Sequence, residues 1–333
     1  MDATRSPANG DRRRLALIGA GWITPAHLAA LDRLGRTTLV GVASARLESA
    51  RATAEPRGAA AYDDIDRLLD EQRPDVVYIA VPPSAAIAAC EAVVARGIPF
   101  LAEKPLSATD ADGPARVAAA VAERGLVAAV GYHLRSLEQL PEVQSRLSER
   151  PAHLVTAHWM DGTPAPAWWL RAEVGGGQVV EQATHLFDLA RLLVGEAEVV
   201  GAASVRDEPV TPTGADVADA TAAVLRFDNG AVGTFANTRR LPTHVVDISF
   251  SSDGLLTTIR RTTDAPGGWE VLFHDGRSAL TLPPGRDPYE IQAEAFLDAV
   301  DAGDPTRVRS SYADAVKTDR LTRAVVAATG ATG

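Results

Sequence analysis

The chain has 333 residues, of which 46% are apolar and 23% are charged, so it is long enough for two domains and lacks a disordered composition. Acidic side chains outnumber basic ones by 43 to 33, and the resulting net charge of −10 disfavours binding to nucleic acid. Cys90 is the single cysteine, which excludes an intramolecular disulfide and suggests an inert buried thiol. No apolar run reaches membrane-spanning length. We therefore expect a cytoplasmic protein with no membrane partner.

Residues 1–13 are polar and lack the apolar stretch of a signal peptide, so we expect a disordered tail. Residues 14–135 then alternate short β-branched runs with segments of helical length, which predicts a Rossmann-type, doubly wound parallel sheet. The expected strands are Leu15–Gly19, Thr38–Ala43, Val76–Ala80, Pro99–Ala102 and Leu126–Val130. The expected helices are Pro25–Leu34, Arg46–Ala54, Asp64–Glu71, Ser84–Arg96 and Asp110–Glu123.

Residues 136–333 show a different pattern, typical of an α+β domain with a largely antiparallel, open-faced sheet. The expected strands are His153–Met160, Ala220–Phe227, Ala231–Arg239, Val245–Ser251, Leu255–Arg260 and Glu270–His274. Asn229-Gly230 is a strong hairpin signal between two of them. One helix is expected over Gln178–Val194, and two final helices, 288–302 and 312–328, are candidates to pack back on the N-terminal domain. We expect this half to bind substrate and to form a homodimer or homotetramer.

The first strand runs directly into Gly19-Ala20-Gly21-Trp22-Ile23, and a helix follows. Gly19 permits the tight turn, and Gly21 lets the backbone approach a pyrophosphate at the helix N-terminus. The third glycine of the usual G-x-G-x-x-G pattern is replaced by Thr24. A dinucleotide site containing Gly19, Gly21, Trp22 and Ile23 is the interpretation favoured by this position in the βαβ series.

The end of the second strand bears on the choice between NADP and NAD. No carboxylate stands there to bind the ribose hydroxyls of NAD, whereas Ser44 and Arg46 are suited to a 2′-phosphate. The alternative is that Arg46 is simply a solvated residue of the next helix. The sequence favours NADP, with NAD possible.

Several further motifs follow along the chain: His27, Val81-Pro82-Pro83, Glu103-Lys104-Pro105, Val130-Gly131-Tyr132-His133, Gly175-Gly176-Gly177 and Glu181 to Asp188. With the Gly19-x-Gly21 loop, and in this order, they resemble the glucose–fructose oxidoreductase, inositol dehydrogenase and rhizopine-catabolism family (Gfo/Idh/MocA) over nearly the whole chain. The departures are Glu181 for the family's usual Asp, Ala183 for its usual Gly, and Ala86 at a position often filled by His.

The resemblance implies roles for residues along the cofactor. Val81, Pro82, Pro83, Glu103, Lys104 and His133 are implied to contact the dinucleotide, with Arg135 near the nicotinamide and a structural or loop role for His27. It also implies that the Lys104–Pro105 peptide is cis.

Lys104 follows an apolar strand at the edge of the sheet where ligands bind in open α/β folds. Glu181, His185 and Asp188 are spaced i, i+4 and i+7, which places them on one face of a helix. An imidazole there is suited to proton transfer near neutral pH, and Glu181 is suited to orient it. A merely structural polar face and a metal site are the alternatives, although the spacing is not a specific metal pattern. We therefore expect Lys104, His185 and Glu181 as catalytic residues and no metal.

The expected reaction is hydride transfer between the nicotinamide and a secondary alcohol or ketone of a sugar, sugar derivative or cyclitol. His185 would exchange the proton, and Lys104 would stabilise the oxygen. The resemblance also allows Lys104 to share or take over the proton transfer. The candidates for substrate contact are Trp169, Arg171, Thr184 and Asp188. The alternatives are an NAD-dependent glycosidase of the same fold and a non-catalytic NADP-binding regulator.

Overall fold

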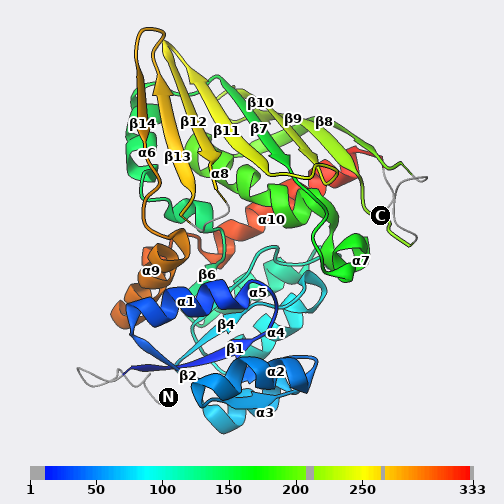
Figure 1. Cartoon of the computed structure of the whole chain (residues 1–333), viewed down its shortest axis with the longest axis vertical. Helices are drawn as coiled ribbons and strands as arrows, with labels where there is room; N and C mark the ends of the chain where they lie inside the picture. Colours follow the sequence, from blue (N-terminus) through cyan, green and yellow to red (C-terminus); the bar gives the residue numbers. More distant parts are fainter. Residues whose placement is uncertain (1–11, 208–213, 264–266, 331–333) are drawn as a thin grey trace. The chain divides into compact units, whose positions relative to one another are not determined.

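The computed structural model describes residues 12–207, 214–263 and 267–330, and these form two compact units. Unit 1 consists of residues up to Ser107, Asp112–Gly131 and Tyr289–Asp314, and unit 2 consists of Ala108–Ala111, Tyr132–Pro288 and the residues from Ala315 onward. Figure 1 traces the chain through both. Within the described residues, no helix is long and apolar enough to cross a membrane.

Unit 1 is built on a six-stranded parallel sheet in the order β3-β2-β1-β4-β5-β6. The strands are β1 (Arg13–Ile18), β2 (Thr37–Ala43), β3 (Ala60–Tyr62), β4 (Val76–Ile79), β5 (Phe100–Ala102) and β6 (Ala128–Val130). Every residue of the short strands β4, β5 and β6 is buried, as a sheet covered on both faces requires. The strand order reverses between β1 and β4, which is the position where doubly wound sheets bind ligands.

The helices of unit 1 connect these strands, except for the last, which comes from a later part of the chain. They are α1 (Thr24–Leu34), α2 (Leu47–Ala54), α3 (Ile65–Gln72), α4 (Pro83–Ala95), α5 (Gly113–Glu123) and α9 (Pro288–Ala302). Phe296 and Leu297 of α9 join the core cluster that contains Leu15 of β1 and Leu28 of α1. The C-terminal helix α9 therefore belongs to the core of unit 1, although about 150 residues of unit 2 precede it in sequence.

Unit 2 contains an eight-stranded sheet in the order β14-β13-β12-β11-β7-β10-β9-β8. The strands are β7 (Leu154–Met160), β8 (Ala197–Val205), β9 (Ala220–Phe227), β10 (Val232–Thr238), β11 (Val245–Ser252), β12 (Leu255–Arg261), β13 (Trp269–His274) and β14 (Ala279–Leu282). Among the described strands of this sheet, the neighbours β7 and β10 are the only parallel pair. The expected hairpin at Asn229-Gly230 joins β9 to β10, and the amide of Phe227 donates to the carbonyl of Ala231 at 2.8 Å.

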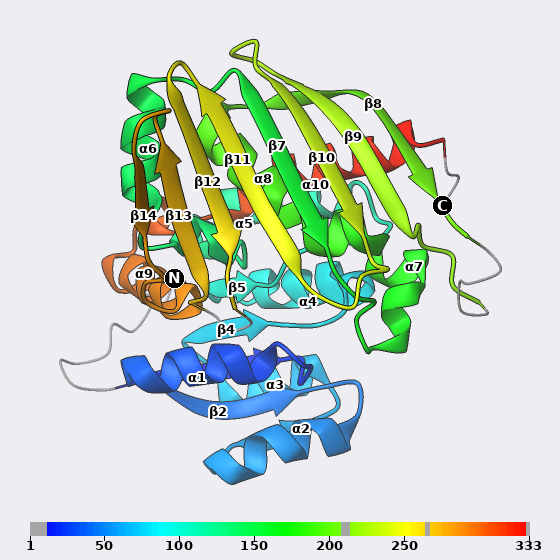
Figure 2. The ribbon, with the colours of Figure 1, turned by 45° about the horizontal axis from the view of Figure 1, so that its top comes forward.

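One face of this sheet is covered by helices, as Figure 2 shows. These helices are α6 (Leu140–Glu149), α8 (Thr184–Val194) and α10 (Tyr312–Ala328), while the short α7 (Ala172–Gly175) precedes α8. Phe187 of α8 stacks on Phe235 of β10 with ring centroids 4.4 Å apart, and Val325 of α10 joins the same core. Residues alternate between buried and exposed along β9 and β10, and no described helix covers the exposed side.

The fold class agrees with the expectation, and the differences lie in detail. Strands β3, β8 and β14 and helix α6 were not expected. β3 has only three residues, and the edge strand β14 is largely exposed, so neither has a clear apolar pattern. The strand expected at Leu15 begins at Arg13, which is 8% exposed and bonded to Asp301, whereas residues 1–11 of the expected tail lie outside the described residues.

Candidate functional site

The glycine loop between β1 and α1 is held against its neighbours in unit 1. Gly19 has a φ of 106°, and a Cβ atom placed there would lie 2.1 Å from the carbonyl oxygen of Ala80. Its amide donates to the carbonyl of Ala43 at 2.8 Å. Only glycine fits this position, because any side chain would collide with backbone.

Gly21 shows the opposite environment. It is exposed, and a Cβ atom placed there would meet no atom within 4 Å, so the backbone is open on this side. Helix α1 begins three residues later and carries no acidic residue in its first turn. An open glycine beside an uncompensated helix N-terminus fits the pyrophosphate of a dinucleotide. Trp22, 70% exposed, and Ile23, half-buried, complete the loop.

The ends of two further strands border the glycine loop. Because Gly19 bonds to Ala43, the loop adjoins the end of β2, where Ser44 is half-buried and Arg46 is exposed. Arg46 precedes the first turn of α2 and has an extended backbone. On the other side, the Ala80 contact brings the loop to Val81, Pro82 and Pro83, and α4 begins at Pro83.

Glu103 and Lys104 follow β5, and the Lys104–Pro105 peptide is cis, as the resemblance implied. Oε1 of Glu103 lies 2.6 Å from Nε2 of His27, and Oε2 accepts a hydrogen bond from the Lys104 amide at 3.1 Å. His27 was expected to have a structural or loop role, but its bond to Glu103 was not expected. The Glu103 carboxylate therefore contacts both α1 and the backbone of Lys104.

His185 lies in unit 2, in the first turn of α8, and is 4% exposed. Its imidazole stacks on Trp159 of β7, with ring centroids 5.8 Å apart and an interplanar angle of 20°. The rings of Tyr132 and His133 approach it edge-on at 5.9 and 4.4 Å. Three rings thus fix the plane of the imidazole.

Tyr132 also connects to the start of α8. Its hydroxyl lies 3.0 Å from Oγ1 of Thr184, which is 1% exposed. Burial, followed by the negative charge of Asp188, raises the pKa of Tyr132 above its usual range. Thr184 was expected to contact substrate, whereas its hydroxyl is bonded to this neutral phenol.

Glu181 lies in a π-helical turn, Val179–Ala183, which directly precedes α8. Such turns are rare and occur frequently at functional sites. Oε2 of Glu181 accepts a hydrogen bond of 2.8 Å from Nε1 of Trp169, and Trp169 is 1% exposed. Trp169 was expected to contact substrate; it is buried, and its indole N–H is bonded to the Glu181 carboxylate.

Asp188, which was expected to contact substrate, lies in the interior of unit 2. It is 1% exposed, and both carboxylate oxygens accept hydrogen bonds of 2.6 Å from Arg135. The hydroxyl of Thr318 on α10 adds a bond of 2.9 Å. Asp188 and Arg135 therefore form a buried, bidentate ion pair.

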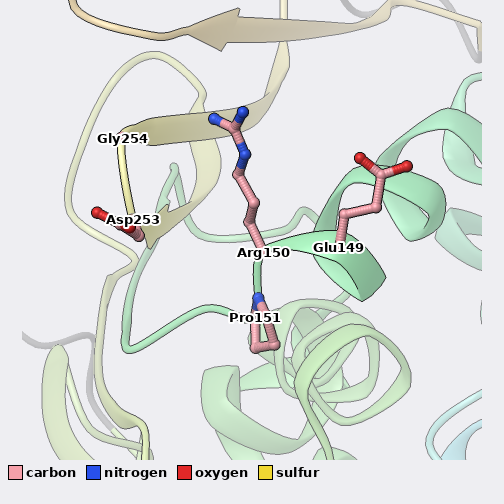
Figure 3. A pocket seen from close by; sticks show the side chains of 5 residues that line it. All are labelled: Glu149, Arg150, Pro151, Asp253 and Gly254. Carbon is pink, nitrogen blue, oxygen red and sulfur yellow. The ribbon is translucent and has the colours of Figure 1, made fainter.

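Arg171 is exposed, and its guanidinium donates to Glu173 at 2.6 Å. A pocket of about 470 Å³ in unit 2, shown in Figure 3, is lined by none of the expected site residues. Its lining residues are Glu149, Arg150, Pro151, Asp253 and Gly254, all exposed. Over the described ranges, no group of three or more His, Cys, Asp or Glu side chains is placed to hold a metal ion.

The contacts that sequence reasoning missed are those between distant segments. Trp159 could have been found from the alternation of β7, which puts it on the buried face with Val155 and Ala157. The bonds from Arg135 and Thr318 to Asp188 had no sequence signal, because the separations are 53 and 130 residues.

Two sequence models of one family match the chain. The model described as "Oxidoreductase family, NAD-binding Rossmann fold" matches residues 13–132, and the Gfo/Idh/MocA C-terminal domain model matches residues 151–255. Together, the two ranges cover more than half of the 333 residues.

Relatives and solved structures agree with these matches. The rhizopine catabolism protein MocA of Rhizobium meliloti is 27% identical, with 92% of each chain covered. A myo-inositol 2-dehydrogenase of Thermotoga maritima is 28% identical, covering 89% of this chain and 90% of the relative. A 3-ketoreductase of Actinomadura kijaniata, solved with NADP and TDP-benzene, has a TM-score of 0.84 at 22% identity, covering 96% of this chain and 98% of that one. The chain therefore belongs to the Gfo/Idh/MocA family of NAD(P)-dependent oxidoreductases.

Proposed function

We propose that the chain transfers hydride between a nicotinamide, preferentially that of NADP, and a secondary alcohol or ketone of a sugar, sugar derivative or cyclitol. The observation that carries this is that Lys104 follows β5 in the same parallel sheet whose β1 leads into the open glycine loop. Ligands of doubly wound sheets bind at the carboxyl ends of the strands, so the loop and the lysine lie at the functional edge.

When bound, the nicotinamide accepts or supplies the hydride. In the oxidising direction, we assign to His185 the removal of the hydroxyl proton and to Lys104 a hydrogen bond to the same oxygen, which stabilises its developing negative charge. In the reducing direction, His185 returns the proton to that oxygen. The buried pair of Trp169 and Glu181 supports a positioning role for Glu181 one turn before His185.

Joint action of Lys104 and His185 is part of the proposal and is tested by a double-mutant cycle. We expect Lys104→Ala and His185→Ala each to lower kcat by about 10² to 10⁴-fold. If both serve one transition state, the double variant will lose much less than the product of the single losses. Strictly multiplicative losses would contradict joint action.

The preference for NADP is supported by Ser44 and the exposed Arg46, which follow a β2 strand without a terminal carboxylate. We expect NADPH to bind about tenfold more tightly than NADH, which corresponds to about 1.4 kcal/mol. Cofactor fluorescence titrations of the wild type and of Arg46→Ala test this. The variant should lose the difference by weakening NADPH binding alone, and tighter NADH binding in the wild type would contradict the preference.

The proposed substrate class is supported by the relatives, which are named for rhizopine catabolism and for inositol dehydrogenation. A panel of cyclitols, sugars and keto-sugars, followed by the change in NADPH absorbance, tests the class. Hydrolysis of a glycoside without net NADPH change would instead indicate a glycosidase, and tight binding without any turnover would indicate a regulator.

We also propose that the uncovered face of the unit 2 sheet is buried in a homo-oligomer. Val224, Val232 and Leu256 are between 41% and 44% exposed on this sheet. An extended apolar face of this kind is typical of subunit interfaces. Light scattering should give a dimer or tetramer for the wild type and a smaller species for Val224→Asp, and a monomeric wild type would contradict this.

A further inference from the structure

We propose that His27 is a positioning residue for Lys104 and acts through the carboxylate of Glu103. The effect on turnover rests on the proposed function, because it assumes that Lys104 takes part in hydride transfer. The structural coupling does not rest on it, because His27, Glu103 and Lys104 all lie in unit 1.

His27 is fixed by the helix that begins at the glycine loop. Its amide donates to the carbonyl of Ile23 at 3.3 Å, which places it in the first turn after the loop. The residue is 2% exposed, and its imidazole meets the rings of Tyr78 and Tyr289 edge-on, at 5.4 and 5.2 Å between centroids. A ring confined on both sides has little freedom to follow a moving partner.

Glu103 is confined just as closely. Its side chain is 9% exposed, one oxygen lies 2.6 Å from Nε2 of His27, and the other accepts from the Lys104 amide. A Cβ atom added to Gly131 would lie 2.7 Å from Oε1 of Glu103, so a side chain at this position would displace the carboxylate. Because a carboxylate accepts and a ring N–H donates, Nε2 of His27 is the donor of this bond.

These contacts form a chain from the glycine loop through α1 and Glu103 to the backbone at Lys104. If the bond from His27 is lost, the Glu103 carboxylate keeps only the amide bond and the space beside Gly131. It then gains freedom to rotate, and the backbone at Lys104 loses a fixed acceptor. His27 thereby couples the position of the lysine to the segment that receives the dinucleotide phosphates.

The composition of the chain offers a direct test, because Lys104 and Lys317 are its only lysines. Protein labelled with [13Cε]lysine should give two side-chain signals by NMR, assigned with Lys317→Arg. We expect His27→Ala to shift or broaden the Lys104 signal and to leave that of Lys317, which is paired with Glu196 in unit 2, unchanged. His27→Gln, whose amide can also donate to Glu103, should restore the Lys104 signal.

The control variant Leu28→Ala distinguishes a general loss of fold stability from a displacement of the Lys104 side chain. Leu28 is the next residue of α1, is 3% exposed and belongs to the core of unit 1. This variant should lower the melting temperature while leaving the Lys104 signal in place. An unchanged Lys104 signal in folded His27→Ala, or a failure of His27→Gln to restore it, would overturn the proposal. If His27→Ala does not fold, the His27→Gln and Glu103→Gln proteins decide: we expect a native-like signal in the first and a shifted one in the second.

Turnover provides a second readout. We expect His27→Ala to lower kcat by about tenfold with little change in the substrate KM, and His27→Gln to recover most of it. A fall in kcat with a rise in KM that Leu28→Ala reproduces would indicate a structural role only. If no substrate is turned over by the wild type, the proposed function fails while the NMR result still decides the coupling.

Discussion

The guanidinium of Arg135 and the carboxylate of Asp188 face each other through two parallel hydrogen bonds of 2.6 Å in the interior of unit 2. Arg135 lies in the short turn that contains His133, and Asp188 lies one turn of α8 after His185. The pair therefore connects the turn that carries His133 to the helix that carries His185, and the centroids of these two imidazole rings lie 4.4 Å apart. A planar, bidentate contact of this kind fixes direction as well as distance.

Breaking one side of this pair should be costly. We expect Asp188→Asn to lower the free energy of unfolding by about 3 to 5 kcal/mol, because the Arg135 charge stays buried without its partner. Replacing both by apolar residues, as in Arg135→Met with Asp188→Leu, should cost much less than the two single changes together. Urea unfolding of the wild type, Arg135→Met, Asp188→Leu and the double variant measures the coupling, and simple additivity would contradict a coupled buried pair.

A change at Gly21 should affect binding and spare the fold. Because a Cβ at Gly21 meets no protein atom within 4 Å, we expect Gly21→Ala to keep the wild-type melting temperature. The methyl group should obstruct the approach of the pyrophosphate and weaken NADPH binding by about tenfold or more. Gly201→Ala in β8, also without neighbours within 4 Å, is the matched control and should bind normally. Equal affinities of the two variants would argue against this loop as the phosphate site.

The thiol of Cys90 should be unreactive in the folded chain. Cys90 is 1% exposed on α4, and burial raises its pKa to about 12, with a smaller opposing effect from a bond to Tyr312. At pH 8, almost none of the thiol is ionised, and the thiolate is the reactive form. We expect no reaction with a thiol-specific chromogenic reagent before unfolding and one equivalent per chain in denaturant. Rapid reaction of the native protein would show that the thiol is accessible.

Glu196 should make stability depend on pH. It accepts hydrogen bonds from Arg191 and Lys317, and the Arg191 bond is the main reason that its pKa falls to about 2. Because this pKa is lower in the folded chain than in the unfolded one, the stabilisation is complete above the usual value of 4.5 and is lost as the pH falls towards 2.

The corresponding variant is Glu196→Gln. Since the Glu196 side chain is 51% exposed, we expect a loss of less than about 1 kcal/mol at pH 7, shrinking as the pH falls below 4.5. Glu198→Gln, which removes a single exposed contact of 3.5 Å to Arg226, is the control and should change little. A Glu196→Gln deficit that grows at low pH would have the wrong sign.

The local patterns in the sequence account for the architecture well. Buried runs predicted the parallel strands, and the helices expected at 288–302 and 312–328 match α9 and α10 to the residue. The glycine pattern predicted the turn after β1 because Gly19 has a positive φ, which glycine adopts readily since it has no Cβ atom. Elements with weak patterns were missed, such as β8, where a register shift between Val199 and Gly201 interrupts the alternation.

Side-chain roles were less predictable, because they depend on partners far away in sequence. The spacing of His185 and Asp188 indicated a shared helix, but it could not show that the Asp188 carboxylate is hydrogen-bonded to Arg135. A regular helix was also assumed over Glu181, where the structure has a π-helical turn. Periodicity describes an ideal helix, whereas burial and hydrogen bonding are properties of the packed chain.

The two lysines allow the most direct test of the central claim, that Lys104 takes part in the nicotinamide-dependent oxidation of a polyol or reduction of the corresponding ketone. The measurement is the steady-state change in NADPH absorbance with the best substrate of the panel, for the wild type, Lys104→Ala and Lys317→Ala. We predict turnover by the wild type and by Lys317→Ala, and a loss of kcat of about 10²-fold or more in Lys104→Ala. Comparable activity of the two lysine variants, or no NADPH-dependent turnover of any polyol or keto-sugar by the wild type, would contradict the account.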